Sequence, residues 1–308
     1  MKLDGYGLRT LCAALRARPE LALKRDIQLP AKAFGAEQRS AWFATDRPIL
    51  NGDDTAALPD GDGYVLFAAE GMRPEFVAAD PWFAGFCSVM VNLSDVAAMG
   101  GRPWAVVDVL YLGQGDNDQV LKGMRDAARE FGVPIVGGHT TRVSGDSGLS
   151  VAVLGKARRL ISSHQARPGQ QLLAAYDLRG AFRGSSGNFD AATNASSARL
   201  RANLALLPEL AEAELVPAGK DVSMAGLCGS LAMLLETSRV GATLRLGDVP
   251  APAFVEPLRW LTAFPSFGFV LTASPQAAPE VCRRFEAAGV DCRVVGENRC
   301  IAQVDAGV

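Results

Sequence analysis

The amino-acid sequence predicts a mixed α/β protein (α/β or α+β) made of two domains. Segments with helical periodicity alternate with short apolar runs in the order helix, strand, helix, strand, which is typical of a sheet with helices packed on one face. The chain has 308 residues, enough for two domains of ordinary size. At Arg167-Pro168-Gly169 a turn precedes a fresh apolar run, so we expect domains at 1–165 and 166–308.

In the first domain, apolar runs and helical patterns follow one another closely. Strands are expected at 64–70, 104–112, 133–138 and 149–157. Helices are expected at 7–23, 81–99 and 116–131. Glycines mark the helix ends, with Gly100-Gly101 after the second helix and Gly132 after the third, and a polar loop is expected between the last two strands.

The second domain repeats this alternation. Helices are expected at 197–214, 227–241 and 279–290, and strands within 166–182 and at 241–246, 267–274 and 292–298. Residues 184–197 are rich in Gly, Ser and Asn and predict a mobile loop. No period of 20–50 residues recurs, which excludes a solenoid.

Composition excludes several classes of function. The 31 basic and 33 acidic residues leave no basic surplus for nucleic-acid binding, so no nucleic-acid partner is expected. No apolar run is long enough for a membrane helix, and the N-terminus lacks the apolar core of a secretory signal. The six cysteines are scattered without a CxxC pair, which favours reduced thiols in the cytoplasm and gives little support to a zinc site.

Asp95 is the most informative polar residue in the apolar pattern. It lies within about one turn of the expected helix end, where the macrodipole is negative, and between apolar neighbours such as Val96. Both features disfavour an unpaired carboxylate. Asn92 shares its helix face, an arrangement that suits one metal ion or one polar ligand. The alternative is a salt bridge or a capping network with Arg102.

Further acids lie at the ends of other expected elements. Asp53 and Asp54 follow Asn51-Gly52, Glu70 ends a strand, and Asp221 opens a loop before an apolar helix. Adjacent carboxylates repel each other, and a divalent cation relieves the repulsion. Mg²⁺ takes few protein carboxylates and adds phosphate and water oxygens, so single acids on separate loops are the expected trace of a nucleotide–metal site. The alternative for Asn51–Asp54 is a simple turn.

The segment Gly137-Gly138-His139-Thr140-Thr141 directly follows the apolar run Val133-Pro134-Ile135-Val136 of an expected strand. Paired glycines allow a backbone to approach a ligand closely with free N–H groups. The alternative is a tight turn that needs positive φ. His139 is either a polar group beside the ligand or an ordinary loop histidine. Neither a GxxxxGK[ST] nor a GxGxxG motif is present.

Taken in order, these segments resemble the aminoimidazole ribotide (AIR) synthase superfamily, which includes thiamine-monophosphate kinase and selenophosphate synthetase. The resemblance spans roughly residues 50–308, and NLSDVAAMGG is its most specific part. The matching stretches are GDDTAAL, AAEGM, DPWFAGFCSVMVNLSDVAAMGGRP, VPIVGGHTT, LSVAVLGKA, RPGQQLLAAYDLRG and DVSMAGLCGSLAMLLETSRVGATLRL.

The resemblance implies a fold, a cofactor and a reaction. An N-terminal α/β domain would form a β-barrel across a homodimer, and a C-terminal α+β domain would pack against it, with ATP and Mg²⁺ in the cleft. The reaction would be phosphorylation of a small molecule, in which catalysis consists mostly of positioning and electrostatics. By position, the implied metal ligands are Asp53, Asp54, Glu70, Asp95 and Asp221. The implied nucleotide-binding residues are Asn92, Gly137, Gly138, Thr140 and Ser223, and the implied catalytic residues are Asp54, Asp95 and His139.

The chain departs from both relatives named above. Where thiamine-monophosphate kinases have two aspartates and an Asp-Gly, this chain has Glu70, His139 and Met224-Ala225. The segments GGHT, DPWFAG and LLETSRVGATLRL are closer to selenophosphate synthetase, but Cys12 lacks the neighbouring glycines and lysine of that family. We therefore expect an AIR-synthase-related paralogue that phosphorylates an unidentified small molecule. The alternatives are a selenophosphate synthetase-like or thiamine-monophosphate kinase-like enzyme, a non-catalytic nucleotide-binding module and a purely structural protein.

Overall fold

The computed structural model describes residues 7–300 except 20, 22–32, 36 and 40–46. The chain forms two compact units. The N-terminal unit comprises the described residues of 35–160 and 192–213, and the C-terminal unit those up to 34, 161–191 and 214–300. The described chain begins in the C-terminal unit, passes to the N-terminal unit at residue 35 and back at residue 161, and returns to the N-terminal unit for residues 192–213.

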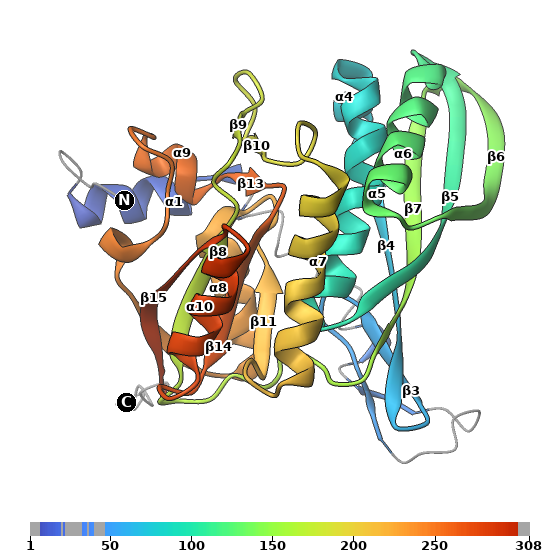
Figure 1. Ribbon diagram of the computed structural model, residues 1–308. Helices are drawn as coiled ribbons and strands as arrows, with labels where there is room; N and C mark the ends of the chain where they lie inside the picture. Colours follow the sequence, from blue (N-terminus) through green and yellow to red (C-terminus); the bar gives the residue numbers. More distant parts are fainter. Residues whose placement is uncertain (1–6, 20, 22–32, 36, 40–46, 301–308) are drawn as a thin grey trace. The chain divides into compact units, whose positions relative to one another are not determined.

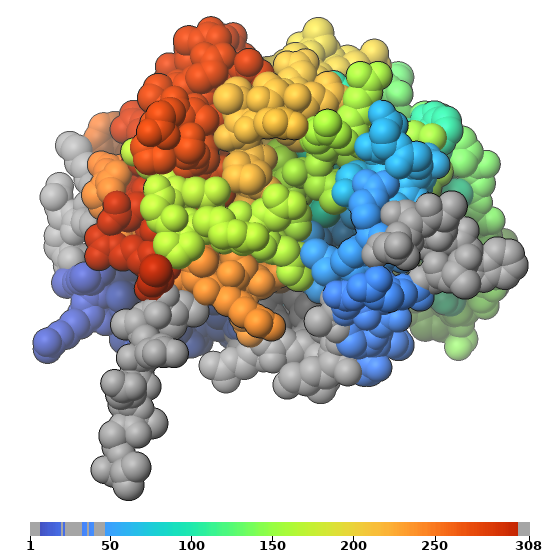
Figure 2. Space-filling view, turned by 90° about the horizontal axis from the view of Figure 1, so that it is seen from below, coloured from blue at the N-terminus to red at the C-terminus, as the bar shows by residue number. Residues whose placement is uncertain are grey.

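A five-stranded sheet with the order β3-β4-β7-β5-β6 forms the base of the N-terminal unit. Its strands are β3 (Ala56–Asp60), β4 (Gly63–Met72), β5 (Arg102–Gln114), β6 (Ile135–Asp146) and β7 (Gly148–Ala157). Neighbouring strands are antiparallel except β5 and β6, which are parallel. The exposed turn between β3 and β4 lies at the surface, where this part of the chain is blue (Figure 2).

Helices cover one face of this sheet (Figure 1). They are α4 (Pro74–Ala79), α5 (Pro81–Ala98), α6 (Asn117–Phe131) and α7 (Ser197–Glu212). The hydrophobic core of the unit lies between the sheet and these helices, where Leu66, Val106 and Val151 are at most 1% exposed. The helices expected at 81–99 and 116–131 are thus confirmed.

Capping and glycine contacts explain where α5 and α6 begin, end and touch. Asp80 accepts a hydrogen bond from Phe83 N at 3.3 Å and starts α5, while Gly132, with φ +74°, ends α6. A Cβ added to Gly85 would come within 2.1 Å of Val120 O. The two helices therefore pack with their backbones in contact, and α5 is buried nearly all round.

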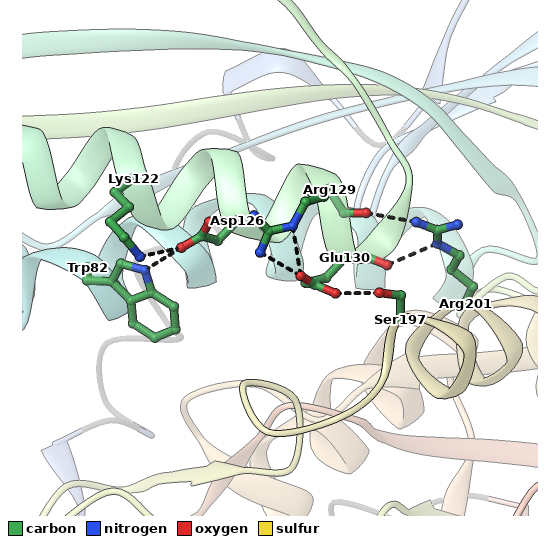
Figure 3. A network of polar contacts seen from close by, with 7 residues as sticks. All are labelled: Trp82, Lys122, Asp126, Arg129, Glu130, Ser197 and Arg201. Atoms are coloured by element: carbon green, nitrogen blue, oxygen red, sulfur yellow. Dashed lines mark hydrogen bonds and ion pairs between the residues drawn. The ribbon is translucent and has the colours of Figure 1, made fainter.

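Helix α7 is tied to α6 by polar contacts (Figure 3). Arg201 donates from Nε to Glu130 O at 3.0 Å and from Nη2 to Arg129 O at 2.8 Å, so it satisfies carbonyls at the C-terminal end of α6. Ser197 Oγ donates to the Glu130 carboxylate. These contacts explain why a helix from the second half of the sequence belongs to the N-terminal unit.

The C-terminal unit is built on an antiparallel sheet with the order β11-β14-β8-β15-β12. Its strands are β8 (Gln171–Tyr176), β11 (Ala218–Asp221), β12 (Gly241–Leu244), β14 (Gly268–Ala273) and β15 (Asp291–Arg299). Its helices are α1 (Leu8–Arg16), α8 (Gly226–Ser238), η2 (Leu246–Asp248), α9 (Pro257–Leu261) and α10 (Ala278–Ala287). None of the helices that the structure describes is long and apolar enough to cross a membrane.

Some expected loops are strands in the structure. His139–Thr141, which follow the strand expected at 133–138, also lie inside β6, where parallel pairing with β5 continues the ladder past Ile135. The Gly/Ser-rich segment 184–197 contains β10 (Asn188–Asp190), which pairs with β9 (Ala181–Phe182) and β13 (Phe264–Pro265). A further short pair joins β1 (Glu37–Gln38) to β2 (Ile49–Leu50). In the first two cases the hydrogen bonds of a partner strand outweigh a local composition that favours loops.

Candidate functional site

Asn92 and Asp95 are buried polar residues on α5. Asn92 is 0% exposed and Asp95 7%. Asn92 Nδ2 donates to Ser88 O at 2.8 Å, but no donor among the described residues reaches Asn92 Oδ1. A buried carbonyl oxygen without a donor costs about 1–3 kcal/mol. Such a cost is expected where a ligand or a bound water supplies the missing contact.

Arg102 does not neutralise Asp95. The guanidinium of Arg102 forms a two-fold ion pair with the carboxylate of Glu212 on α7, with Nη2 and Oε2 3.2 Å apart. This pair lowers the pKa of Glu212, chiefly through the hydrogen bond from Arg102. The local salt bridge between Asp95 and Arg102, the alternative for the polar end of α5, is therefore wrong.

Packing places the end of α5 over β4 and β7. A Cβ added to Gly155 would come within 2.5 Å of Val96 Cγ1, and Gly155 pairs with Leu66. Helix α5 follows β4 through the short α4 and runs back along it. Asn92 precedes Val96 by one helical turn, about 6 Å, which is the length of about two strand residues. Asn92 therefore lies near the level of Ala68 on β4.

The Gly-Asp-Asp segment approaches the same level from β3. Ala56, the first residue of β3, pairs with Phe67 of β4, and Thr55 directly precedes this pair in the chain. Thr55 is 4% exposed, and no described residue provides a hydrogen-bond partner for its Oγ1. Asp53 and Asp54, which are half-buried, precede it. Thr55 is absent from the sequence prediction because a threonine after two aspartates looks like ordinary turn chemistry.

Glu70 belongs to a row of residues that crosses the sheet. Glu70 pairs with Val151, Val151 with Asp108, and Asp108 with Gly138. Directly paired residues point to the same face, and Val151 is buried beneath the helices. Glu70 and Asp108 thus lie on the helix-covered face, with Glu70 exposed near the end of β4.

Asp108 is the acid that sequence reasoning missed. It is half-buried, and burial raises the pKa of its carboxyl above the usual range, against a smaller lowering by its own backbone N–H. A Cβ added to Gly138 would come within 2.4 Å of Asp108 Oδ1, so the glycine leaves room for the carboxylate. The signal in the sequence was a single aspartate inside the apolar run WAVVDVLYL.

The paired glycines do not form a tight turn. Neither Gly137 nor Gly138 has positive φ, which excludes the turn expected as an alternative. Both are exposed on β6, at the edge of the sheet, with His139 and Thr140. His139 Nε2 lies 3.3 Å from Thr141 Oγ1. An edge strand keeps every second N–H free for a ligand.

Asp221 and Ser223 belong to the C-terminal unit. Asp221 is the last residue of β11 and pairs with Phe269 of β14. Ser223 N donates to Ser230 Oγ on α8 at 3.1 Å. Gly226, with φ +64°, then begins α8.

The oxygen-rich composition of the site suits a hard cation. Within the part of the chain that the structure describes, no group of three or more His, Cys, Asp or Glu side chains converges to hold a metal ion. Mg²⁺ commonly uses only one or two protein carboxylates and completes its shell with phosphate and water. The buried oxygens of Asn92 and Thr55 beside the acids fit such an ion and do not fit a softer metal that prefers nitrogen or sulfur.

Comparison with known proteins identifies the family. Residues 52–157 match the AIR synthase related protein, N-terminal domain, and residues 143–298 match the C-terminal domain of the same family. An uncharacterized protein of Synechocystis sp. is 47% identical over 87% of this chain and 82% of its own length. An uncharacterized protein of Methanocaldococcus jannaschii is 37% identical over 70% of this chain and 68% of its own length.

Solved structures share the fold. Thermotoga maritima PurL complexed with ATP has a TM-score of 0.71 at 21% identity, over 96% of this chain and 51% of PurL. AaThiL complexed with AMPPCP and TMP has a TM-score of 0.65 at 18% identity, over 89% of this chain and 90% of its own. The chain thus spans about half the length of PurL but nearly all of AaThiL. The expected two-domain fold is confirmed, and the chain belongs to the AIR synthase related protein family.

Proposed function

We propose that the protein is an ATP- and Mg²⁺-dependent phosphotransferase or synthetase that acts on a small molecule, with the phosphates of ATP bound near the end of α5. The observation that carries this proposal is the burial of the polar side chains Asn92 and Asp95 on one face of α5, where no described residue donates to Asn92 Oδ1. The ATP-bound PurL and AMPPCP-bound AaThiL, which share the fold, support the choice of nucleotide.

Asp54 and Asp95 would hold Mg²⁺, with Asp53 and Glu70 as further carboxylates of the same unit. The ion would neutralise charge on the phosphate oxygens. Asn92 Oδ1 and Thr55 Oγ1 would orient the water or phosphate group that reaches them. The burial of Asn92 and Asp95 excludes bulk water, which strengthens each electrostatic contact at this place.

Residues of β6 would contact the nucleotide from the open edge of the sheet. Gly137 and Gly138 carry no side chain that blocks approach to the backbone, and Thr140 adds a hydroxyl. His139 would donate to a phosphate oxygen. A nucleotide-dependent enzyme of this kind would work in the cytoplasm, where the free thiols of the chain stay reduced.

Replacement of Asp95 tests the proposal. Asp95→Asn keeps the shape and removes the charge, so Mg²⁺-dependent ATP turnover should fall at least about 100-fold, the usual loss for one electrostatic group. The melting temperature should change little, since Asn has nearly the same shape as Asp. Asp62→Asn, in the exposed turn between β3 and β4, is the matched control. Unchanged Mg²⁺-dependent ATP turnover in Asp95→Asn would contradict the proposal.

A non-catalytic nucleotide-binding module is the second candidate. It is favoured by Glu70 and His139, which stand where thiamine-monophosphate kinases have aspartates. Calorimetry with ATP and Mg²⁺ separates the two candidates, because a binding module gives heat of binding but no ADP with any small molecule. If the protein binds ATP, ATP at 100 times its dissociation constant should raise the free energy of unfolding by about 2.7 kcal/mol. If the protein does not bind nucleotide, ATP should cause no shift of the melting temperature.

A homodimer through the uncovered face of the sheet is also part of the proposal. Phe67 and Leu154 pair across β4 and β7 on the face opposite the core, and they are 51% and 36% exposed. Val107 and Tyr111 of β5 are 41% and 46% exposed. Exposed apolar patches of this kind mark interaction surfaces. A second copy would bury the patch and close the two sheets into a barrel.

Analytical sedimentation measures the oligomeric state of the protein directly. Wild type should sediment as a dimer and Val107→Lys as a monomer, since a buried unpaired charge opposes association. Leu121→Lys, at an exposed position of α6, is the control and should remain dimeric. A monomeric wild type at micromolar concentration would contradict the dimer.

A further inference from the structure

We propose that Cys282 and Cys292 form a redox site, in which a peroxide converts the two thiols into a disulfide that joins α10 to β15. This inference goes beyond the proposed function, because it assigns a modification site in the C-terminal unit that phosphoryl transfer does not use. The site lies between a helix and a strand that the structure describes in full.

Helix α10 brings Cys282 to the sheet of the C-terminal unit. The helix packs on β8, β14 and β15 (Figure 1). Its buried face includes Val281 and Phe285, both 0% exposed, and Cys282 follows Val281 at the border of this face. Cys282 is half-buried, so a small oxidant can reach its sulfur from solvent.

Strand register brings Cys292 to the same place from the sheet. Cys292 is the second residue of β15 and pairs with Ala175 of β8. Ala174 and Tyr176, the neighbours of Ala175 on its strand, belong to the hydrophobic core beneath α8. Because successive residues of a strand alternate between the two faces of a sheet, Ala175 and Cys292 lie on the opposite face, beneath α10. Cys292 is accordingly only 3% exposed.

The two thiols are in direct contact. Cys292 donates its S–H to the sulfur of Cys282, and this hydrogen bond lowers the pKa of Cys282 against the opposing effects of burial and of Glu286. The same hydrogen bond raises the pKa of Cys292, and burial raises it further. The pair thus divides the roles of a redox-sensitive dithiol. Cys282 is the accessible thiol that ionises more readily, and Cys292 is the protonated thiol that resolves its oxidised form.

The reaction consumes one hydrogen peroxide for each disulfide. The thiolate of Cys282 attacks a peroxide oxygen, the O–O bond breaks, and the departing hydroxide takes a proton from solvent to leave as water. The sulfur of Cys292 then attacks the sulfenic acid on Cys282. The S–S bond forms, the S–O bond breaks, and hydroxide leaves with the thiol proton of Cys292 as a second water. Two thiols are oxidised and the peroxide is reduced, and a dithiol reductant reverses the modification.

Peptide mapping of the full chain tests the proposal. Arg283 and Arg284 lie between the two cysteines, so trypsin releases them in separate peptides, 260–283 and 285–293. After treatment with hydrogen peroxide and blocking of the remaining free thiols, these peptides should be joined by a disulfide, and dithiothreitol should separate them. Cys300→Ser, which removes an exposed thiol, is the control and should form the same linkage. The absence of the linked peptides at a peroxide concentration that oxidises Cys300 in wild type would overturn the proposal.

Two variants test the roles of the two thiols. In Cys292→Ala, peroxide should leave a sulfenic acid on Cys282 that dimedone traps, because the resolving thiol is missing. In Cys282→Ala, trapping at Cys292 should be at least about 10-fold weaker, because its sulfur is buried and protonated. Equal trapping in the two variants would overturn the proposal. Neither measurement involves nucleotide, so its outcome is independent of the proposed function.

Discussion

Arg102 is bound by Glu212 and not by Asp95. Arg102 opens β5 and Glu212 ends α7, so their two-fold ion pair joins the beginning of a strand to the end of a helix within the N-terminal unit. The basic side chain that follows Asp95 most closely in the sequence is thereby engaged elsewhere. The ion pair therefore assigns Arg102 to the contact between β5 and α7.

A double-mutant cycle measures this ion pair. The two side chains are 50% and 30% exposed, so the coupling between Arg102→Ala and Glu212→Ala in urea unfolding should be at most about 1 kcal/mol at pH 7. The pair lowers the pKa of Glu212, so its contribution is present above the unfolded pKa and is lost as pH falls through the folded pKa. Coupling of Arg102 to Asp95 in place of Glu212 would contradict the structure.

Asn92→Leu should stabilise the protein and weaken ATP binding. The substitution removes a buried oxygen that no described residue satisfies, so the free energy of unfolding should rise by about 1 kcal/mol, while ATP affinity falls at least about 10-fold. Ser88→Ala is the control on the same helix. Ser88 Oγ donates to Gly85 O at 2.8 Å, so its loss should cost stability and leave ATP affinity unchanged. Equal destabilisation by both variants would count against a ligand at Asn92.

Asp108→Asn should raise stability at neutral pH. Burial raises the folded pKa of Asp108, so the folded state holds its proton more tightly than the unfolded state, and stability falls as pH rises from the unfolded pKa through the folded one. The asparagine variant has no carboxyl group at this position, so its stability does not fall in this way as pH rises. Its melting temperature should exceed that of wild type at pH 7 by up to about 3 °C, and the difference should shrink toward pH 4. A difference independent of pH would assign the effect to packing.

The helices and the apolar strands were predictable because their signals are local. Asp80 and Pro81 start α5, and Gly132 ends α6, as the sequence indicates. β3 was not predictable in this way. It has Pro59 and Asp60 within five residues and is a strand because it lies at the edge of the sheet, where a missing N–H is tolerated.

The residues of the candidate site also differ in whether the sequence alone could predict them. Asn92 and Asp95 stand out in the sequence because polar residues interrupt an apolar helix, and their burial agrees with that interpretation. Asp108 became visible only through strand register, which places it beside Gly138, and Thr55 only through its burial next to β3. Register depends on pairing between distant segments, so single polar residues within strands give no local sign of what they face. The roles of the acids toward Mg²⁺ stay predictions.

The attachment of α7 to α6 should depend on Arg201. Its guanidinium donates two hydrogen bonds to the carbonyls of Arg129 and Glu130 in the last turn of α6. The positive charge of Arg201 also interacts favourably with the negative C-terminal end of the helix dipole. Arg201→Ala should therefore lower the free energy of unfolding by about 1 kcal/mol and the melting temperature by about 2–4 °C. Arg125→Ala, at an exposed position of α6, is the control and should stay within about 0.5 kcal/mol of wild type. An equal effect of the two substitutions would mean that α7 is held by its apolar contacts alone.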